Sequence, residues 1–158
     1  MINTRSVNYS RTEQHHMILP GDLNGNGRLF GGTLLCMIDE VAGMVARRHS
    51  GNYNVTTASI KKLDFKAGAY LNDILVLVGY VTYTGRTSME IRVDTYVEDS
   101  QGMRRPINCA YFIMVALDQN NHPTPIPTLE VQTEAEKARW STRRWQSRWR
   151  ARRRSRQC

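Results

Sequence analysis

The sequence is poor in cysteine and contains no long apolar run. Its 158 residues include three cysteines, Cys36, Cys109 and Cys158, which are widely spaced and form no paired ligand motif. They predict neither a disulfide framework nor a metal site. No segment approaches the roughly 18–20 apolar residues that a membrane span requires. Because no basic segment followed by an apolar one opens the chain, we expect a cytoplasmic protein.

Acidic residues are missing from the end of the chain. All 14 lie at or before Glu136, with 12 of the 22 lysines and arginines, so residues 1–136 carry a net charge of −2. The overall charge of +8 therefore comes from residues 137–158, where ten cations alternate with Trp140, Trp145 and Trp149. The body of the chain offers no electrostatic case for nucleic-acid binding.

This distribution predicts two regions, a folded domain over residues 1–122 and a Pro-containing linker with a basic tail over 123–158. The tail is either a solvated extension that packs its tryptophans on a neighbouring subunit, or a basic amphipathic helix. Such a helix would contact anionic lipid or nucleic acid. We expect the solvated extension.

A glycine-rich loop followed by a helical pattern organises the domain. Residues 24–32 read Asn-Gly-Asn-Gly-Arg-Leu-Phe-Gly-Gly, and four glycines in nine positions allow a sharp turn and a close approach to another group. The pattern over 33–49 is helical, with Thr33 as the expected cap. Apolar residues recur there at spacings of four, three and four: Leu34, Ile38, Val41 and Val45.

Asp39 shares a helical stripe with small residues, Ala42 and Ala46. Small residues let a helix press closely on a partner surface, and a carboxylate beside them is partly desolvated, as a group tuned for proton transfer would be. Alternatively, Asp39 turns toward solvent or pairs with Arg47 or Arg48, since structural ion pairs are also common. The spacing alone leaves both interpretations open.

β-branched and aromatic residues dominate the segments around this helix. The strand at 87–98 alternates most clearly between apolar and polar residues, which indicates one buried and one wet face. A long helix followed by four strands with short links predicts an α+β fold, in which an antiparallel sheet wraps around one central helix. The expected strands are 12–19, 55–65, 74–84, 87–98 and 107–117.

Four motifs stand in a fixed order: the loop at 24–32, Met37-Ile-Asp-Glu-Val-Ala-Gly43, Thr57-Ala-Ser59 and Gly85-Arg-Thr-Ser-Met89. Together they resemble the hotdog-fold acyl-CoA thioesterases, above all the cytosolic acyl-CoA hydrolase branch, over about residues 12–137. The resemblance implies a hotdog fold and hydrolysis of acyl-CoA to fatty acid and coenzyme A, with no cofactor and no metal. It also implies homodimers that join their sheets edge to edge, commonly assembled into a homohexamer as a trimer of dimers.

The resemblance makes Asn24 and Asp39 the catalytic pair. Thioester hydrolysis needs a water activated at the carbonyl carbon and donors for the developing oxyanion. Asp39 would deprotonate that water or attack the carbonyl itself, while the Asn24 amide would orient the water or the carbonyl. The backbone N–H groups of Gly31 and Gly32, where the helix begins, would form the oxyanion hole because first-turn amides lack partners within the helix.

Coenzyme A requires cations for its phosphates. Arg86, Thr87 and Ser88 lie at a turn before a strand and suit phosphate contact, and the resemblance supports this stretch. Lys62 adds positive charge, although surface lysines are more often simply solvated. Many relatives carry an acid where this chain has Lys61, so contacts there are expected to differ.

Other functions fit the loop less well. It lacks the Gly-Lys-Ser or Gly-Lys-Thr of NTPase phosphate loops, and no βαβ pattern surrounds it as in a dinucleotide site. Hotdog dehydratases require a histidine in the loop or helix, and residues 24–40 contain none. The remaining alternatives are a non-catalytic acyl-CoA or nucleotide-sensing module and an RNA-binding protein that acts through its tail.

Overall fold

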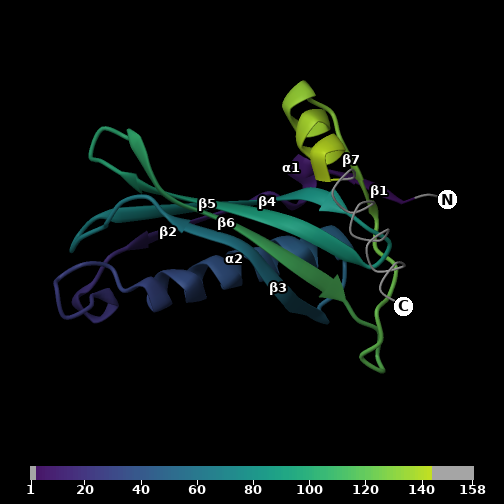
Figure 1. Ribbon diagram of the computed structural model, residues 1–158, viewed down its shortest axis with the longest axis horizontal. Coiled ribbons are helices and arrows are strands. Elements are labelled where there is room, and N and C mark those ends of the chain that lie inside the picture. The colour runs from purple at the N-terminus through teal and green to yellow at the C-terminus, as the bar shows by residue number, and fades with distance from the viewer. Residues whose placement is uncertain (1–2, 144–158) are drawn as a thin grey trace, which may run out of the picture.

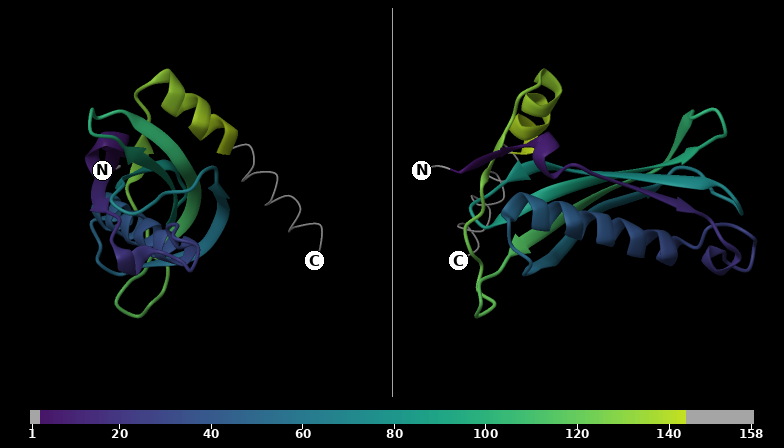
Figure 2. Two further views of the ribbon diagram at one scale, coloured as in Figure 1. Left: turned by 90° about the vertical axis from the view of Figure 1, so that its left-hand side faces the viewer. Right: turned by 180° about the vertical axis from the view of Figure 1, so that it is seen from behind.

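The computed structural model describes residues 3–143. A curved antiparallel sheet holds one long helix, α2 (Gly31–Ser50), on its concave side (Figures 1 and 2). This is the architecture that the sequence predicts. In spatial order the strands of the sheet are β2 (Thr12–Met17), β4 (Ile74–Thr84), β5 (Ser88–Glu98), β6 (Arg104–Ala116) and β3 (Val55–Phe65), each antiparallel to its neighbour.

The strands at 55–65 and 74–84 match their predicted bounds, whereas β2 is shorter and β6 longer than expected. Strand β6 begins at Arg104, which pairs with Glu98 across the β5–β6 hairpin. The Asp99 carboxylate closes this hairpin by accepting the N–H groups of Gln101 and Met103, both at 2.9 Å. The turn chemistry, rather than the apolar pattern, therefore sets where β6 starts.

Helix α2 begins at Gly31, so the prediction that Thr33 caps it is wrong. Phe30 occupies the N-cap position and offers no side-chain hydrogen bond, which leaves the first-turn amides without a cap. The helix ends as expected, with Arg47 and Arg48 in its last turn and Gly51 at the C-cap in the left-handed region, at φ +70°.

The apolar stripe of α2 packs on the sheet as predicted. Leu34, Ile38, Val41 and Val45 are at most 2% exposed. Gly79 of β4 lies directly beneath the helix, where a Cβ would come within 2.6 Å of Val41 and 3.0 Å of Val45. A side chain at this position would force the helix off the sheet, so Gly79 permits the close helix–sheet approach.

Short elements from both ends of the chain close the structure near the C-terminal end of α2: β1 (Thr4–Ser6), α1 (Val7–Ser10) and β7 (Thr128–Glu130). The 3₁₀ turn η1 (Pro20–Asp22) lies at the other end of α2, where the Asp22 carbonyl accepts the Phe30 N–H at 2.9 Å. Strand β1 pairs in parallel with β7, and Leu129 of β7 is 5% exposed in the core. Residues of the expected linker thus pack against the domain, and the domain boundary at 122 stays a prediction.

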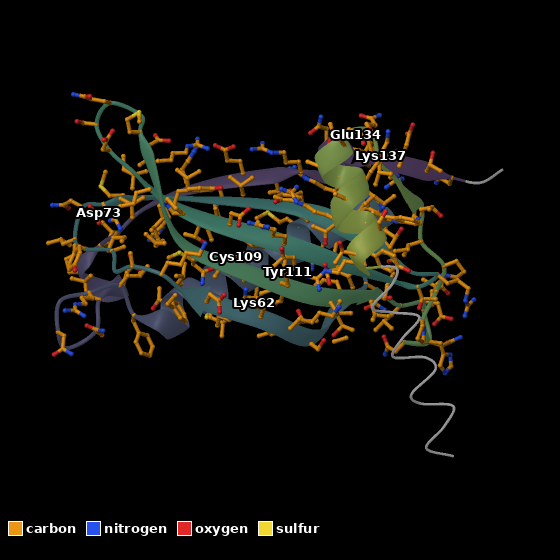
Figure 3. All side chains as sticks on the ribbon, turned by 45° about the horizontal axis from the view of Figure 1, so that its top comes forward. Lys62, Asp73, Cys109, Tyr111, Glu134 and Lys137 are labelled. Carbon is orange, nitrogen blue, oxygen red and sulfur yellow. The ribbon has the colours of Figure 1, made fainter. Side chains whose placement is uncertain are left out.

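A helix over residues 134–143 lies on the convex face of the sheet, opposite α2 (Figures 1 and 2). Thr133 and Glu136 cap it reciprocally: Thr133 Oγ1 accepts the Glu136 N–H at 3.1 Å, and Glu136 Oε2 accepts the Thr133 N–H at 3.2 Å. Figure 3 shows Glu134 and Lys137 on its first turn. The expected tail beyond residue 143 lies outside the described residues. None of the helices within 3–143 has the length and apolar character needed to span a membrane.

Candidate active site

Asp39 lies midway along α2, and its side chain is held by Thr57 of β3. Thr57 Oγ1 donates a 2.7 Å hydrogen bond to Asp39 Oδ1, and it also lies 3.3 Å from Met114 Sδ. Within residues 3–143 Asp39 forms no ion pair, which removes the alternative of a pair with Arg47 or Arg48. Asp39 is exposed in the single protomer, so it turns toward solvent and the expected partial desolvation is not seen there. Its carboxylate is reachable by water and by a ligand.

An open groove of about 900 Å³ surrounds the Asp39 carboxylate. Residues of β2, α2, β3 and β6 line it, with apolar Met44, Val55 and Met114 beside polar Thr56 and Thr57. The volume falls within the range of small-molecule sites, about 300–1,000 Å³. Thr57 is a site residue that sequence reasoning did not assign, although it opens the Thr57-Ala-Ser59 motif that carries part of the family resemblance.

Asn24 shapes the glycine loop with the oxygen of its side chain. Asn24 Oδ1 accepts the N–H of Asn26 at 2.9 Å and that of Arg28 at 3.2 Å. Its backbone carbonyl accepts the N–H of Gly27, which adopts the left-handed φ of +73°. The oxygen is used inside the loop, and the amide Nδ2 has no partner among the described residues, so its N–H groups can donate to a group outside the loop.

Gly31 and Gly32 open α2, where the N–H groups lack intrahelical partners. Leu34 is the first residue of the helix whose N–H finds a carbonyl, that of Phe30 at 3.1 Å. The Phe30 ring lies across Gly32, where a Cβ would come within 2.7 Å of it, and the Phe65 ring lies 3.6 Å from the corresponding point on Gly31. Aromatic rings thus lie beside both glycines, and first-turn amides without a partner in the helix are suited to bind an oxyanion.

Asn24 and Asp39 do not meet within one protomer. The glycine loop extends beyond the N-terminal end of α2 (Figure 1). Asp39 lies eight residues past Gly31, which corresponds to about 12 Å of helix. No hydrogen bond joins the two side chains among the described residues. The proposed pair is therefore incomplete in a single chain.

The turn between β4 and β5 carries Arg86, Thr87 and Ser88. The Gly85 N–H closes the turn on the Ser88 carbonyl at 2.8 Å, and the Arg86 side chain is exposed. In the strand register, Met89 pairs with Met114, which pairs in turn with Thr57. The turn thus lies at the same end of the sheet as the Thr57–Asp39 hydrogen bond.

Lys62 is exposed on β3, opposite Tyr111 of β6 (Figure 3). Its Nζ forms a 2.9 Å ion pair with Asp64, and this hydrogen-bonded carboxylate raises the pKa of Lys62. The positive charge of Lys62 is thus already partly compensated, which makes Lys62 a weaker candidate for phosphate contact than Arg86.

Lys61 has a structural partner that accounts for a cation at this position. Its Nζ lies 2.9 Å from Glu90 Oε2, and the Glu90 side chain is 1% exposed. Thr82 Oγ1 and Arg143 Nε also approach the other carboxylate oxygen, at 2.8 and 2.7 Å. A buried carboxylate is costly unless it is paired and hydrogen-bonded, so Lys61 and Arg143 together make Glu90 tolerable on this face.

Solved structures with the same architecture are thioesterases. An apo-hexameric acyl-CoA thioesterase superposes with a TM-score of 0.89 at 40% identity, covering 96% of this chain and 97% of that one. An acyl-CoA hydrolase from Staphylococcus aureus, in complex with butyryl coenzyme A and coenzyme A, gives 0.86 at 31% identity, covering 98% and 94%. The antiparallel sheet wrapped around one helix is therefore the hotdog fold, as expected.

Sequence relatives point to the same family. The model of the thioesterase superfamily matches residues 26–103. An uncharacterised acyl-CoA thioester hydrolase of Bacillus subtilis is 35% identical, covering 84% of this chain and 77% of that protein. The cytosolic acyl coenzyme A thioester hydrolase of Rattus norvegicus is 36% identical over 85% of this chain, which spans only 36% of that longer relative. The chain belongs to the thioesterase superfamily, in the family of the acyl-CoA thioester hydrolases.

Proposed function

We propose that this protein is a cytoplasmic acyl-CoA thioesterase, which hydrolyses acyl-CoA to a free fatty acid and coenzyme A. The observation that carries the proposal is the exposed Asp39 carboxylate, held by Thr57 within an open groove. A carboxylate that is fixed in direction and open to water is what activation of a water at a thioester carbonyl requires. The name of the rat relative, a cytosolic hydrolase, supports both the activity and the compartment.

In the proposed mechanism, the thioester carbonyl lies between the start of α2 in one protomer and the Asp39 carboxylate of a second copy, because these groups are about 12 Å apart within one chain. The N–H groups of Gly31 and Gly32 donate to its oxygen as negative charge develops there, and the Asn24 Nδ2 amine orients the carbonyl or the attacking water. Asp39 removes a proton from the water, or attacks the carbonyl carbon itself to form a mixed anhydride that water then cleaves. The thiolate of coenzyme A leaves and is protonated.

The spacing of the pair supports this assignment. Structures of the Staphylococcus aureus hydrolase include alanine variants at one Asn, one Asp and one Thr, and its Asn and Asp lie fifteen residues apart. Asn24 and Asp39 have the same separation, and Thr57 contacts Asp39. We assign the phosphates of coenzyme A to Arg86, Thr87 and Ser88, with a smaller contribution from Lys62.

A dimer would complete the site. Strand β3 is an edge of the sheet, and its residues 56–62 are exposed, so a second copy can pair there and extend the sheet. In such a dimer the glycine loop of one protomer would face α2 of its partner and bring Asn24 to Asp39. Related thioesterases are described as hexameric, which supports a trimer of such dimers.

The proposed chemistry uses water, a carboxylate and amide donors, with no cofactor or metal; coenzyme A is part of the substrate and product. Residues 3–143 contain no group of three His, Cys, Asp or Glu side chains arranged to hold a metal ion. Free thiol released from a panel of short-, medium- and long-chain acyl-CoA esters tests the proposal. We expect turnover of at least one ester. Binding of acyl-CoA without thiol release by an assembled preparation would instead indicate a sensing module.

A further inference from the structure

The glycine loop forms a short antiparallel hairpin, which we call the glycine hairpin (residues 22–30). Leu23 and Leu29 pair across it in an antiparallel bridge. Nearer the tip, the Asn24 N–H donates to the Arg28 carbonyl at 2.7 Å. Because hydrogen bonds hold the two arms together, a change of angle at the base of the hairpin carries Asn24 with it.

Asp22 forms the base of the glycine hairpin and connects it to β2 and α2. Its carbonyl accepts the N–H of Phe30, the N-cap residue of α2, at 2.9 Å. Its carboxylate oxygen Oδ2 accepts the Leu19 N–H at 2.8 Å and lies 2.8 Å from His16 Nε2 of β2. These two hydrogen bonds lower the pKa of Asp22, so the carboxylate is charged at neutral pH. The Asp22 side chain is only 17% exposed, so both contacts are partly shielded from water.

A neighbouring loop supports the other arm of the glycine hairpin through its backbone. The Leu29 N–H donates to the Ala69 carbonyl at 2.8 Å, and Arg28 forms an antiparallel bridge with Tyr70. These contacts do not involve the Asp22 side chain. A variant without the Asp22 carboxylate keeps this support, so we expect a change in the direction of the hairpin and not a loss of the fold.

We propose that Asp22, held by His16, is a positioning residue that fixes the direction in which the glycine hairpin presents Asn24 to the Asp39 carboxylate of a second copy. The proposal rests on the proposed function and its shared site. The hairpin extends beyond the N-terminal end of α2 (Figure 1), so in the shared site Asn24 acts across an interface. A small rotation at the base displaces the tip, and a displacement of about 1 Å can cost roughly a hundredfold in rate. The Asp22–Phe30 hydrogen bond places the first turn of α2, with its oxyanion donors, in the same way.

Steady-state kinetics of thiol release from acyl-CoA tests this role. Asp22→Ala removes both contacts of the carboxylate, so kcat should fall at least about tenfold while KM changes less than about twofold, because the phosphate contacts are untouched. Asp22→Asn keeps an oxygen that can accept the same two contacts and should recover most of kcat. His16→Leu removes one contact and should lower kcat by a smaller factor. Asp99→Ala is the matched control and should retain kcat, because its carboxylate also accepts two backbone N–H groups but in the turn between β5 and β6.

Mixed dimers then show in which site the Asp22 substitution acts. Asp22 and Asn24 belong to the same hairpin, so a mixed dimer of Asp22→Ala and Asp39→Ala has one site with both substitutions and one intact site. The two variants, unfolded and refolded together, should restore up to about a quarter of wild-type activity. A mixture of Asp22→Ala and Asn24→Ala places one substitution in every site of a mixed dimer, so it should be no more active than the variants refolded separately. A merely structural Asp22 would not produce this difference.

The possible results separate this proposal from the proposed function. Wild-type kcat in assembled Asp22→Ala would overturn the positioning role and leave the thioesterase activity standing. Absence of recovery with Asp39→Ala, or recovery with Asn24→Ala instead, would also overturn it. If Asp22→Ala does not assemble, His16→Leu takes its place in the same comparisons, and an unchanged kcat in that variant would count against the proposal. A wild type that releases no thiol from any ester would refute the proposed function, and this proposal would fall with it.

Discussion

Thr57 Oγ1 donates a 2.7 Å hydrogen bond to Asp39 Oδ1 and thereby joins edge strand β3 to helix α2. The two residues are 18 positions apart in the chain, and neither is buried. The bond uses one oxygen of the carboxylate and restricts its orientation, and Asp39 and Thr57 both line the groove. Among the described residues Asp39 has this hydrogen bond and no ion pair, which supports the proposal that it acts on the substrate.

We expect Thr57→Val to separate orientation from binding. Valine keeps the shape of threonine but removes the hydrogen-bond donor, so only the orientation of the Asp39 carboxylate changes. We therefore expect kcat to fall by roughly tenfold with little change in KM. Thr57→Ser should restore most of the rate. Thr56→Val, which alters the neighbouring residue in the same groove, serves as the control. Equal kcat in Thr57→Val and wild type would contradict a positioning role.

Asp39→Asn preserves the size of the side chain and removes the base. Turnover should fall by at least about a hundredfold, the usual scale for loss of a general base. Folding should be nearly unaffected because Asp39 is exposed. Glu40→Gln removes the adjacent acid, which lines the same groove, and should retain activity. Steady-state thiol release on assembled protein measures both, and near wild-type turnover in Asp39→Asn would disprove the assignment.

The repeating patterns of the sequence predict the main fold because they report burial. The helical spacing from Leu34 marks a core face, as predicted, and the apolar positions around Met89 are also buried. The expected wet face of the strand at 87–98 is wrong, because Glu90 and Asp94 are only 2% and 8% exposed. Arg143, on the helix over residues 134–143, pairs with Glu90 on that face.

Such patterns do not predict local features that depend on single residues. The sequence places the cap of α2 at Thr33, but Phe30, which has no capping side chain, occupies the N-cap position. Strands β1 and β7 are three residues long, too short for a periodic signal, and they pair across the whole chain.

The candidate site is readable from the sequence only through the family resemblance. No local sequence pattern indicates that Asn24 in the loop and Asp39 in the helix lie close together. Within one protomer the two side chains have separate partners and do not contact each other. The Thr57–Asp39 contact depends on the register of an edge strand that contains two bulges, and no local pattern encodes that register.

Buried His49 should make stability sensitive to mild acid. Its ring is 0% exposed between the Ser10 hydroxyl, 3.2 Å from Nδ1, and the Pro127 carbonyl, 3.1 Å from Nε2. Burial lowers the pKa of His49, while the Pro127 hydrogen bond opposes the shift. The folded protein favours the neutral ring of His49. The contribution of His49 to the stability of the protein is therefore fully present above the unfolded pKa of about 6.5, and it is lost as pH falls through the lower pKa of the folded state.

Thermal unfolding at a series of pH values between 8 and 5 measures this effect. The Tm of the wild type should decrease below about pH 6.5. His49→Gln should have a lower Tm at neutral pH but lose much of this decrease. His15→Gln changes an exposed histidine and should follow the wild-type profile. An unchanged pH profile in His49→Gln would show that other groups control acid sensitivity.

Two truncations separate the docked helix from the basic tail. Ending the chain after residue 143 keeps Trp140, which packs against the core, and Arg143, which pairs with Glu90. Ending it after Glu136 removes both and should lower the Tm by roughly 4–8 °C, equivalent to about 2 kcal/mol. Both proteins should retain thiol release and lose any binding to anionic vesicles or RNA. An assembled but inactive protein ending after 143 would place the tail in the site.

A shared site predicts that two inactive variants restore each other. Asn24→Ala and Asp39→Ala change residues that lie apart in one chain, so the pair is proposed to form between protomers. The two variants are unfolded together, refolded as a mixture and assayed for thiol release. In a mixed dimer with shared sites, one site inherits both substitutions and the other inherits neither. Random pairing should then restore up to about a quarter of wild-type activity, given two-fold symmetry.

Each variant refolded alone provides the background for this experiment, and refolded wild type gives the yield. If each protomer built its own site, every site in the mixture would carry one substitution and activity would stay at background. A mixture of Asp39→Ala with Thr57→Val offers a matched control, because these two residues contact each other within one protomer. In this control mixture every mixed dimer carries one substitution in each site. The activity of the mixture should therefore not exceed the activity expected from the two variants refolded separately.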